Sequence, residues 1–217
     1  RRKPLGELLQ LGLPMGFSHF VEISSFTLMA LFVAQLGATA VAGHRIVANL
    51  AAICYMLPLA LGIATLAQVG QAAGARHWRR AELSIGAGLL LAGGLSALLG
   101  LLLWSIAVPL TGAYTDDRAV QAVALALVGY VAFYQIFDAV QTIAAHALRG
   151  YRITFVPMCV HVVCFWGVGL LGGWWLALHA PRPMGVAGFW LASVLSLVLA
   201  AALLGALLWR ALRAVQR

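Results

Sequence analysis

Charged side chains are scarce in this sequence, and their scarcity excludes an ordinary soluble fold. Only 9% of the 217 residues are Asp, Glu, Lys or Arg, whereas 63% are hydrophobic and the mean hydropathy is +0.97. Soluble domains carry about 25% charged residues. A domain of this size cannot bury so much apolar surface in a single core. The composition therefore predicts an integral membrane protein that lies in a lipid bilayer.

The sequence also lacks the patterns of disulfide frameworks, metal centres and common enzymes. Its three cysteines, Cys54, Cys159 and Cys164, are odd in number and form no CxxC pair, so we interpret them as small buried hydrophobes. His161 and Cys164 lie one helical turn apart, but two ligands do not make a metal site. No nucleophile, metal-ligand set or phosphate-binding loop accompanies the few acidic residues. We therefore do not expect an enzyme or a bound organic cofactor.

Long apolar runs are what the sequence has in place of these features. They show no strand-like alternation, so they predict helices, and about 20 helical residues cross a hydrocarbon layer of roughly 30 Å. Six runs are long enough, at residues 12–35, 45–67, 83–109, 119–147, 153–178 and 185–209. The connections between them are short. We predict an all-α integral membrane protein, with residues 1–217 forming a single bundle of six transmembrane helices.

Lysine and arginine flank the predicted spans unevenly. If both ends of the chain lie on one side of the membrane, only Arg45, Arg118 and Arg182 of the 14 basic residues fall on the other side. The positive-inside rule then predicts that both ends are cytoplasmic. This bias also accounts for the formal net charge of +8. Because no basic patch lies outside the membrane flanks, we expect no nucleic-acid partner.

Two of the six acidic residues, Glu22 and Asp138, fall inside predicted spans. A charged group at the centre of a membrane costs roughly 2.5–3.5 kcal/mol on the insertion scale, so such residues usually face a cavity or a partner inside the bundle. Tyr134, Asp138 and Gln141 follow i, i+4, i+7 spacing and share one helical face. Asp138 is therefore the centre of a polar stripe on the fourth predicted span.

The first predicted span carries a similar stripe. Ser18, Glu22 and Ser25 repeat the same spacing, and His19 lies beside them. If the two stripes face each other, they form an acidic pocket with no fixed positive charge nearby. Such a pocket suits a proton, a sodium ion or an organic cation, and competition for one negative site can couple two cations in exchange. The alternative is that each carboxyl is protonated and structural.

Three stretches carry a resemblance to a known family: "GLPMGFSHFVEISSF", "LGATAVAGHRIVANLAAICYMLPLALGIATLAQVGQAAGA" and "YQIFDAVQTIAAHALRGYRITFVP". Over essentially its whole length the chain resembles the C-terminal half, helices seven to twelve, of a multidrug and toxic compound extrusion (MATE) transporter of the NorM-like bacterial branch. One departure is Gln68, which stands where relatives often carry a basic residue.

The resemblance implies a bacterial inner-membrane antiporter that exports organic cations and drugs in exchange for Na⁺ or H⁺ by alternating access. It implies that Glu22, Asp138 and Tyr134 bind the coupling cation, which is Na⁺ or H⁺. From their places on or beside the two polar stripes, we add Gln141, Ser18, Ser25 and His19 as supporting groups. It also implies a partner, an N-terminal six-helix lobe. The Arg-Arg-Lys start resembles the linker between such lobes, so we expect a segment of a longer chain rather than a half-size homo-oligomer.

Two rival functions remain at this point. A flippase of the same superfamily that moves lipid-linked glycans predicts a large basic cavity, whereas the stripes predict an acidic one. A structural, non-transporting membrane subunit would leave both carboxylate stripes without a purpose.

Overall fold

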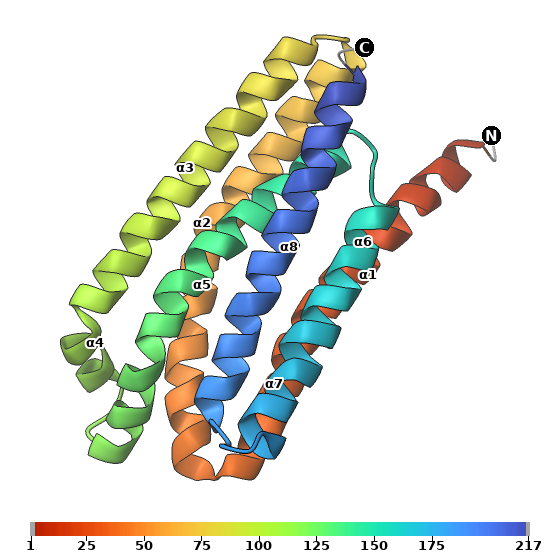
Figure 1. Ribbon diagram of the computed structural model, residues 1–217. Coiled ribbons are helices and arrows are strands. Elements are labelled where there is room, and N and C mark those ends of the chain that lie inside the picture. Colours follow the sequence, from red (N-terminus) through yellow and green to blue (C-terminus); the bar gives the residue numbers. More distant parts are fainter. Residues whose placement is uncertain (1–2, 216–217) are drawn as a thin grey trace.

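The computed structural model describes residues 3–215, which are almost entirely helical (Figure 1). In chain order the elements are α1 (Lys3–Val33), η1 (Ala34–Leu36), α2 (Ala38–Gly74), α3 (Trp78–Ser105), α4 (Ala107–Tyr114), α5 (Arg118–Gly150), α6 (Phe155–His161), η2 (Val162–Leu171), α7 (Gly172–Trp174), η3 (Trp175–His179) and α8 (Val186–Val215). The four elements from α6 to η3 form one continuous helix. Within residues 3–215, six helical segments are long and apolar enough to cross a membrane.

Several helices extend past the apolar runs that predict them. The second runs from Ala38 to Gly74: Gly37, at φ +99°, makes the turn before it, the helix continues through Pro58, and it ends just before Arg76, which has a φ of +57°. The third ends earlier than its apolar run, at Ser105, where a break at Ile106 starts the short helix α4. Hydropathy detects the hydrocarbon layer, whereas a helix continues until its hydrogen-bonding pattern is interrupted.

Helix α5 is the centre of the bundle and packs against α2, α3 and α8. Small residues allow these helices to approach closely, as is common in membranes. At Gly100 of α3, for example, an added Cβ would lie 2.8 Å from the backbone oxygen of Ala132 on α5. At Gly43 of α2 it would lie 2.5 Å from Val123 Cγ1. At these two glycines, α3 and α2 therefore approach α5 more closely than a residue with a Cβ would allow.

Helix α1 is attached differently. It lies beside α6 and η2 in Figure 1, packs mainly on these two elements, and makes few contacts with α2. Its attachment includes two hydrogen bonds: Ser25 Oγ donates to the backbone oxygen of Phe165 at 3.1 Å, and Trp166 Nε1 donates to Ser24 Oγ at 3.0 Å. Its membrane-spanning window is the least buried of the six. Space therefore remains between α1 and the α2–α5 side of the bundle.

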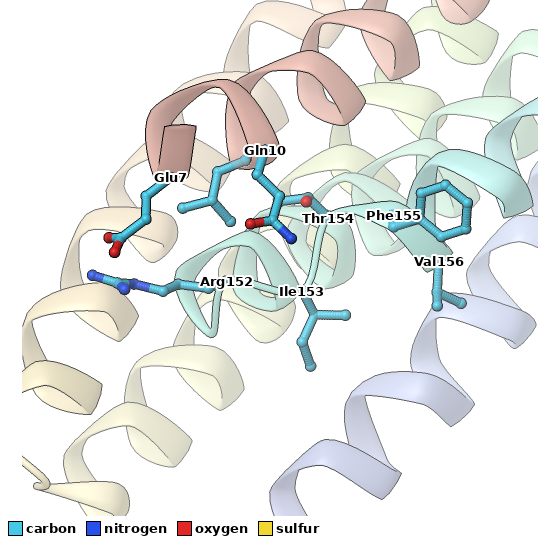
Figure 2. Close-up of a pocket in the computed structure, with 8 residues that line it drawn as sticks. Glu7, Gln10, Arg152, Ile153, Thr154, Phe155 and Val156 are labelled. Atoms are coloured by element: carbon cyan, nitrogen blue, oxygen red, sulfur yellow. The ribbon is translucent and has the colours of Figure 1, made fainter. Parts of the chain in front are cut away.

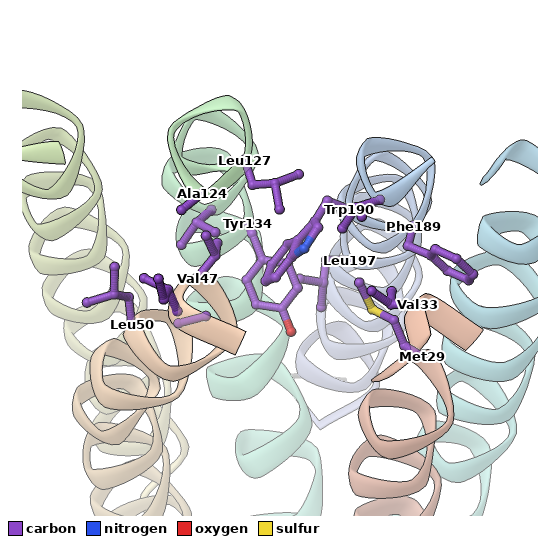
Figure 3. Close-up of a cluster of buried hydrophobic side chains, with 14 of the residues drawn as sticks. Met29, Val33, Val47, Leu50, Ala124, Leu127, Tyr134, Phe189, Trp190 and Leu197 are labelled. Atoms are coloured by element: carbon purple, nitrogen blue, oxygen red, sulfur yellow. The ribbon is translucent and has the colours of Figure 1, made fainter. Parts of the chain in front are cut away.

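A large apolar cluster borders that space. Trp190 of α8 is 0% exposed, and its ring meets those of Phe26 and Tyr134 edge-on, with centroids 6.1 and 5.7 Å away. The Trp190 indole N–H donates to His44 Nδ1 at 3.2 Å. Figure 3 shows the hydroxyl of Tyr134 pointing away from its neighbours in the cluster. The cluster thus holds the Tyr134 ring and leaves its polar end free.

Candidate functional site

The structure brings Glu22 of α1 together with Asp138 and Tyr134 of α5. All three line one cavity of about 410 Å³ between α1, α2 and α5, and His19 lines it as well. The charges of Glu22 and Asp138 both act on the hydroxyls of Tyr55 and Tyr134. The charge of Glu22 also acts on Asp138. Most of the remaining wall is apolar, and Phe26 and Leu59 belong to it. The two polar stripes on the first and fourth spans therefore meet across a cavity with apolar walls.

Asp138 is buried, with 3% of its surface exposed, and one side-chain amide holds it. Gln141 Nε2 donates to Asp138 Oδ1 at 3.0 Å and to Thr142 Oγ1 at 3.1 Å. The Gln141 amide oxygen is buried and has no hydrogen-bond partner among residues 3–215. Asp138 lines the cavity and Gln141 does not, so the amide holds the carboxylate from behind the cavity wall. A buried acceptor without a partner gains most from a donor or a cation.

Two side chains, Tyr55 and His19, contact Glu22, and the contact from Tyr55 was not expected from the sequence. The Tyr55 hydroxyl of α2 donates to Glu22 Oε1 at 3.3 Å, and His19 Nδ1 lies 3.5 Å from Glu22 Oε2. Tyr55 lies inside an apolar run, where a tyrosine that packs and a tyrosine that binds a carboxylate look alike. The only signal for its role was that it lies in one of the three stretches that carry the family resemblance.

The expectation that no fixed positive charge lies near the carboxylates was wrong. Arg149, near the end of α5, is 7% exposed, and its Nη1 lies 3.2 Å from His19 Nε2. Arginine can only donate, so Nε2 accepts, and a neutral His19 then carries its proton on Nδ1, facing Glu22. The position of Arg149 at a predicted membrane flank concealed this role. Its helix continues to Gly150, and α1 places His19 within reach of the guanidinium.

Two other predicted supporting groups, Ser18 and Ser25, lie in different surroundings. Ser25 does not line the large cavity; it lines a much smaller one that also borders Glu22 and Tyr134. Ser18 is 1% exposed and lines neither of the two. The shared helical face is real, but neighbouring turns of that face meet different partners, because α1 lies between α2 and η2.

A third cavity, of about 420 Å³, lies near the start of α1 and is separate from these groups. Figure 2 shows Glu7 and Arg152 pointing toward each other across it, with Gln10, Thr154 and Phe155 nearby. Its walls come from the first turns of α1 and from the connection between α5 and α6. None of the predicted site residues lines it.

The donor set around Glu22 and Asp138 fits a hard monovalent cation. Among residues 3–215, no three His, Cys, Asp or Glu side chains converge as they do in transition-metal sites. The available ligands are carboxylate, amide and hydroxyl oxygens. These are the atoms that alkali ions and organic ammonium groups prefer.

These features together define a multi-pass membrane protein, with an all-α bundle of six helices and a carboxylate-lined cavity inside it. The chain belongs to the MatE family, whose model matches residues 14–175. The resemblance drawn from the sequence is thereby confirmed.

Named relatives agree with this family. A "Probable multidrug resistance protein NorM" of Aromatoleum aromaticum is 59% identical over 211 residues, which cover 96% of this chain and 46% of the relative. "Multidrug resistance protein PmpM" of Pseudomonas aeruginosa is 37% identical over 205 residues, which cover 94% of this chain and 43% of the relative. The chain therefore spans about half the length of the curated relatives it matches.

Solved structures show the same fold. An outward-facing multidrug resistance MATE family transporter of the MOP superfamily superposes with a TM-score of 0.90 at 14% identity, over 100% of this chain and 48% of that one. The eukaryotic MATE transporter AtDTX14 gives a TM-score of 0.87 at 19% identity, over 94% of this chain and 46% of that one. The predicted fold, one six-helix lobe of a two-lobe MATE architecture, is confirmed.

Proposed function

We propose that this chain is the C-terminal lobe of a secondary antiporter that exports organic cations in exchange for Na⁺ or H⁺. The observation that carries the proposal is the meeting of Glu22 and Asp138, from helices far apart in the sequence, in one cavity with apolar walls. Intramembrane carboxylates that face a cavity typically mark ion pathways. The names of the NorM and PmpM relatives support drugs as the cargo.

Transport by this lobe requires a second lobe and a defined orientation in the membrane. We propose that an N-terminal six-helix lobe of the same full-length chain supplies the opposite wall, because the relatives are about twice as long. The bacterial relatives favour the inner membrane, and the distribution of basic residues favours both ends of this lobe in the cytoplasm. The outer surface of the lobe then contacts the surrounding lipid. We propose transport and no catalytic reaction for this lobe.

The coupling of ion binding to helix movement depends on the two carboxylates lying on different helices, α1 and α5. Glu22 and Asp138 repel each other when both are charged, and they lie on helices that make little direct contact. A cation bound between them removes the repulsion and draws α1 toward α5. Release of the cation restores the wider cavity. Because α1 has few contacts with α2, this equilibrium can be shifted by the differential binding of a single ion.

The cavity also provides contacts for an organic cation. Tyr55, Tyr134 and Phe26 offer aromatic surface within the same cavity as the two carboxylates. Flat or alkylated ammonium ions gain both charge attraction and cation–π contact in such surroundings. A glycan carrier with a diphosphate would instead meet two carboxylates, so the acidic lining favours cation export over the flippase alternative.

The proposal is tested with the full-length protein in energised inverted vesicles. Ethidium transport is followed by fluorescence while a Na⁺ gradient and a pH gradient are applied separately. We expect transport to follow at least one gradient and to stop when that gradient is collapsed with an ionophore. Ethidium movement that ignores both gradients would exclude antiport by this protein.

Arg149 provides a prediction about ion affinity. Its charge acts on Glu22 and competes there with any bound cation. Arg149→Gln is therefore expected to lower the ion concentration for half-maximal transport by about three- to tenfold, the size of a Coulomb effect of roughly 1 kcal/mol. Turnover should fall because the ion leaves more slowly.

Two further variants separate charge from packing. Arg149→Lys keeps the positive charge and should retain the wild-type half-maximal ion concentration. Arg152→Gln removes an exposed arginine nearby and should have little effect. An unchanged or raised half-maximal concentration in Arg149→Gln would contradict the competition between this arginine and the ion.

A further inference from the structure

The cavity near the start of α1 lies at the edge of the membrane-spanning part of the bundle. Its volume is about 420 Å³, a size typical of small-molecule sites, and its walls are residues 7, 10 and 11 of α1 and residues 152–156. Two of the candidate membrane spans, Leu5–Leu36 and Phe155–His179, begin at these walls. We call this space the interfacial cavity. Neither Glu22 nor Asp138 lines it, so it is separate from the site proposed for the coupling ion.

The interfacial cavity presents one charge of each sign. Glu7 and Arg152 point toward each other across it in Figure 2, but neither forms an ion pair with another residue of the described part of the chain, 3–215. The side chains of Gln10 and Thr154 line the same cavity and have no hydrogen-bond partner within that part either. A carboxylate, a guanidinium, an amide and a hydroxyl are therefore all available to one ligand. A ligand that carries a positive and a negative group matches both charges at once.

The end of α5 fixes where the Arg152 side chain leaves the backbone. Arg152 has a φ of +62° and occupies the left-handed position that closes a helix. Its N–H donates to the Arg149 backbone oxygen at 2.9 Å, and the Ile153 N–H donates to that of Leu148 at 2.9 Å. Glycine is the usual residue at such a position, because a Cβ is unfavourable there. The guanidinium thus stands at the cavity wall on a fixed backbone, although no carboxylate of residues 3–215 pairs with it.

The remaining lining of the interfacial cavity is apolar. Leu11 and Ile153 belong to it, and so do Phe155 and Val156, whose side chains are 63% and 46% exposed. Figure 2 shows the Phe155 ring well apart from the Glu7 carboxylate. In a bilayer, exposed apolar side chains at the beginning of a span contact acyl chains. A ligand with a charged end and an apolar end therefore fits the cavity better than a small soluble ion does.

We propose that the interfacial cavity binds the headgroup of a phosphatidylethanolamine molecule from the surrounding bilayer, with its phosphate at Arg152 and its ammonium at Glu7. Arginine makes paired, charge-assisted hydrogen bonds to phosphate oxygens. The primary ammonium has three N–H donors for the Glu7 carboxylate and the Gln10 amide oxygen. A phosphatidylcholine headgroup has the same charges but no N–H on its nitrogen, and phosphatidylglycerol has no positive charge. The bound lipid then links the start of α1 to the connection between α5 and α6.

The test uses the purified full-length protein in detergent, after the native lipid has been removed. Dioleoyl phosphatidylethanolamine, phosphatidylcholine or phosphatidylglycerol is added at increasing mole fractions, and thermal unfolding is followed. A ligand that binds only the folded state raises the melting temperature, and the rise is larger when the affinity is higher. We expect the ethanolamine lipid to give the largest rise. Equal rises with all three lipids would overturn recognition of the headgroup.

Water-soluble glycerophosphoethanolamine distinguishes a lipid from a free zwitterion. It carries the same phosphate and ammonium without acyl chains, so it lacks the contacts with the apolar part of the cavity. We expect no rise in melting temperature at concentrations at which the ethanolamine lipid saturates the protein. A rise equal to that given by the lipid would mean that the ligand is a soluble zwitterion and would overturn the lipid assignment.

Two variants separate the two ends of the headgroup. Glu7→Gln should remove the preference for the ethanolamine lipid over phosphatidylcholine, because these lipids differ only at the nitrogen. Arg152→Gln should weaken the apparent affinity for all three lipids by about threefold or more, the strength of an exposed ion pair, because all three contain the phosphate. Both residues are exposed, so we expect both variants to fold, and the melting temperature without lipid checks this. Arg79→Gln is the matched control, because Arg79 is exposed at the start of α3 and does not line the cavity.

Two results from these variants would contradict the site. The wild-type lipid preference in Glu7→Gln, together with wild-type affinity in Arg152→Gln, would place the lipid elsewhere on the protein. An equal loss of affinity in Arg79→Gln and Arg152→Gln would mean that the lipid responds only to the overall charge of the protein. None of these measurements depends on transport, so a failure of the antiporter proposal would leave the lipid site standing, and the reverse also holds.

Discussion

Asp138→Asn in the full-length protein is expected to abolish ion-driven ethidium export, and Glu22→Gln is expected to have the same effect. Each substitution removes one of the two negative charges that line the large cavity and leaves the side-chain shape nearly unchanged. The interaction of a carboxylate with a cation at contact distance is worth about 4 kcal/mol near a protein surface, and about 1.4 kcal/mol is tenfold in rate. We therefore expect initial export rates to fall by at least about tenfold.

Folding should survive the Asp138 substitution, because Gln141 Nε2 can still donate to the Asn oxygen that replaces Asp138 Oδ1. Expression and thermal stability measured on the same membranes check this. Asp116→Asn is the control, since Asp116 is exposed in the turn before α5. If both cavity variants export ethidium at the wild-type rate, the carboxylates are structural groups and the coupling site lies in the other lobe.

Trp190→Ala is expected to produce the largest loss of stability among single substitutions in this lobe. Trp190 is fully buried, touches the rings of Phe26 and Tyr134, and donates to His44. Removal of a buried aromatic ring leaves a cavity that its neighbours fill only partly, and Trp→Ala changes typically cost about 3–5 kcal/mol. In a bilayer most of this cost comes from lost packing, because lipid is as apolar as the protein interior.

The measurement is unfolding of the full-length protein in mixed micelles with increasing SDS. Trp175→Ala serves as the matched control, because Trp175 is 51% exposed and its loss should have only a small effect. Trp190→Leu should recover part of the stability, as it restores some of the volume. Equal loss of stability in the Trp190→Ala and Trp175→Ala variants would show that the cluster does not hold the lobe together.

The parts of this protein that could be predicted from the sequence are those with a local signal. Six long apolar runs predict six membrane helices. The rarity of acids inside such runs draws attention to Glu22 and Asp138, and helical spacing adds Tyr134 to the same face. The structure brings these three residues to one cavity. Whether they bind an ion stays a prediction.

The parts that could not be predicted depend on which helices are neighbours. Tyr55 contacts Glu22 only because α2 lies opposite α1. Arg149 follows a membrane span, where the positive-inside rule already explains an arginine, so nothing local indicates that it turns inward to His19. The π-helical turns of η2 have no reliable sequence pattern, and the small cavity they border is invisible without them.

The attachment of α1 to η2 has a consequence for the biogenesis of the protein. A nascent chain is synthesised and enters the bilayer from its N-terminal end, so α1 is inserted long before Phe165 and Trp166, its hydrogen-bonding partners, have been translated. During that interval Glu22 has no α5 or η2 against which to lie. The exposed leucines of α1, Leu8, Leu13 and Leu31 among them, must therefore keep the helix in the membrane alone. The cavity-facing side of α1 therefore meets all of its partners only when the fifth span leaves the ribosome.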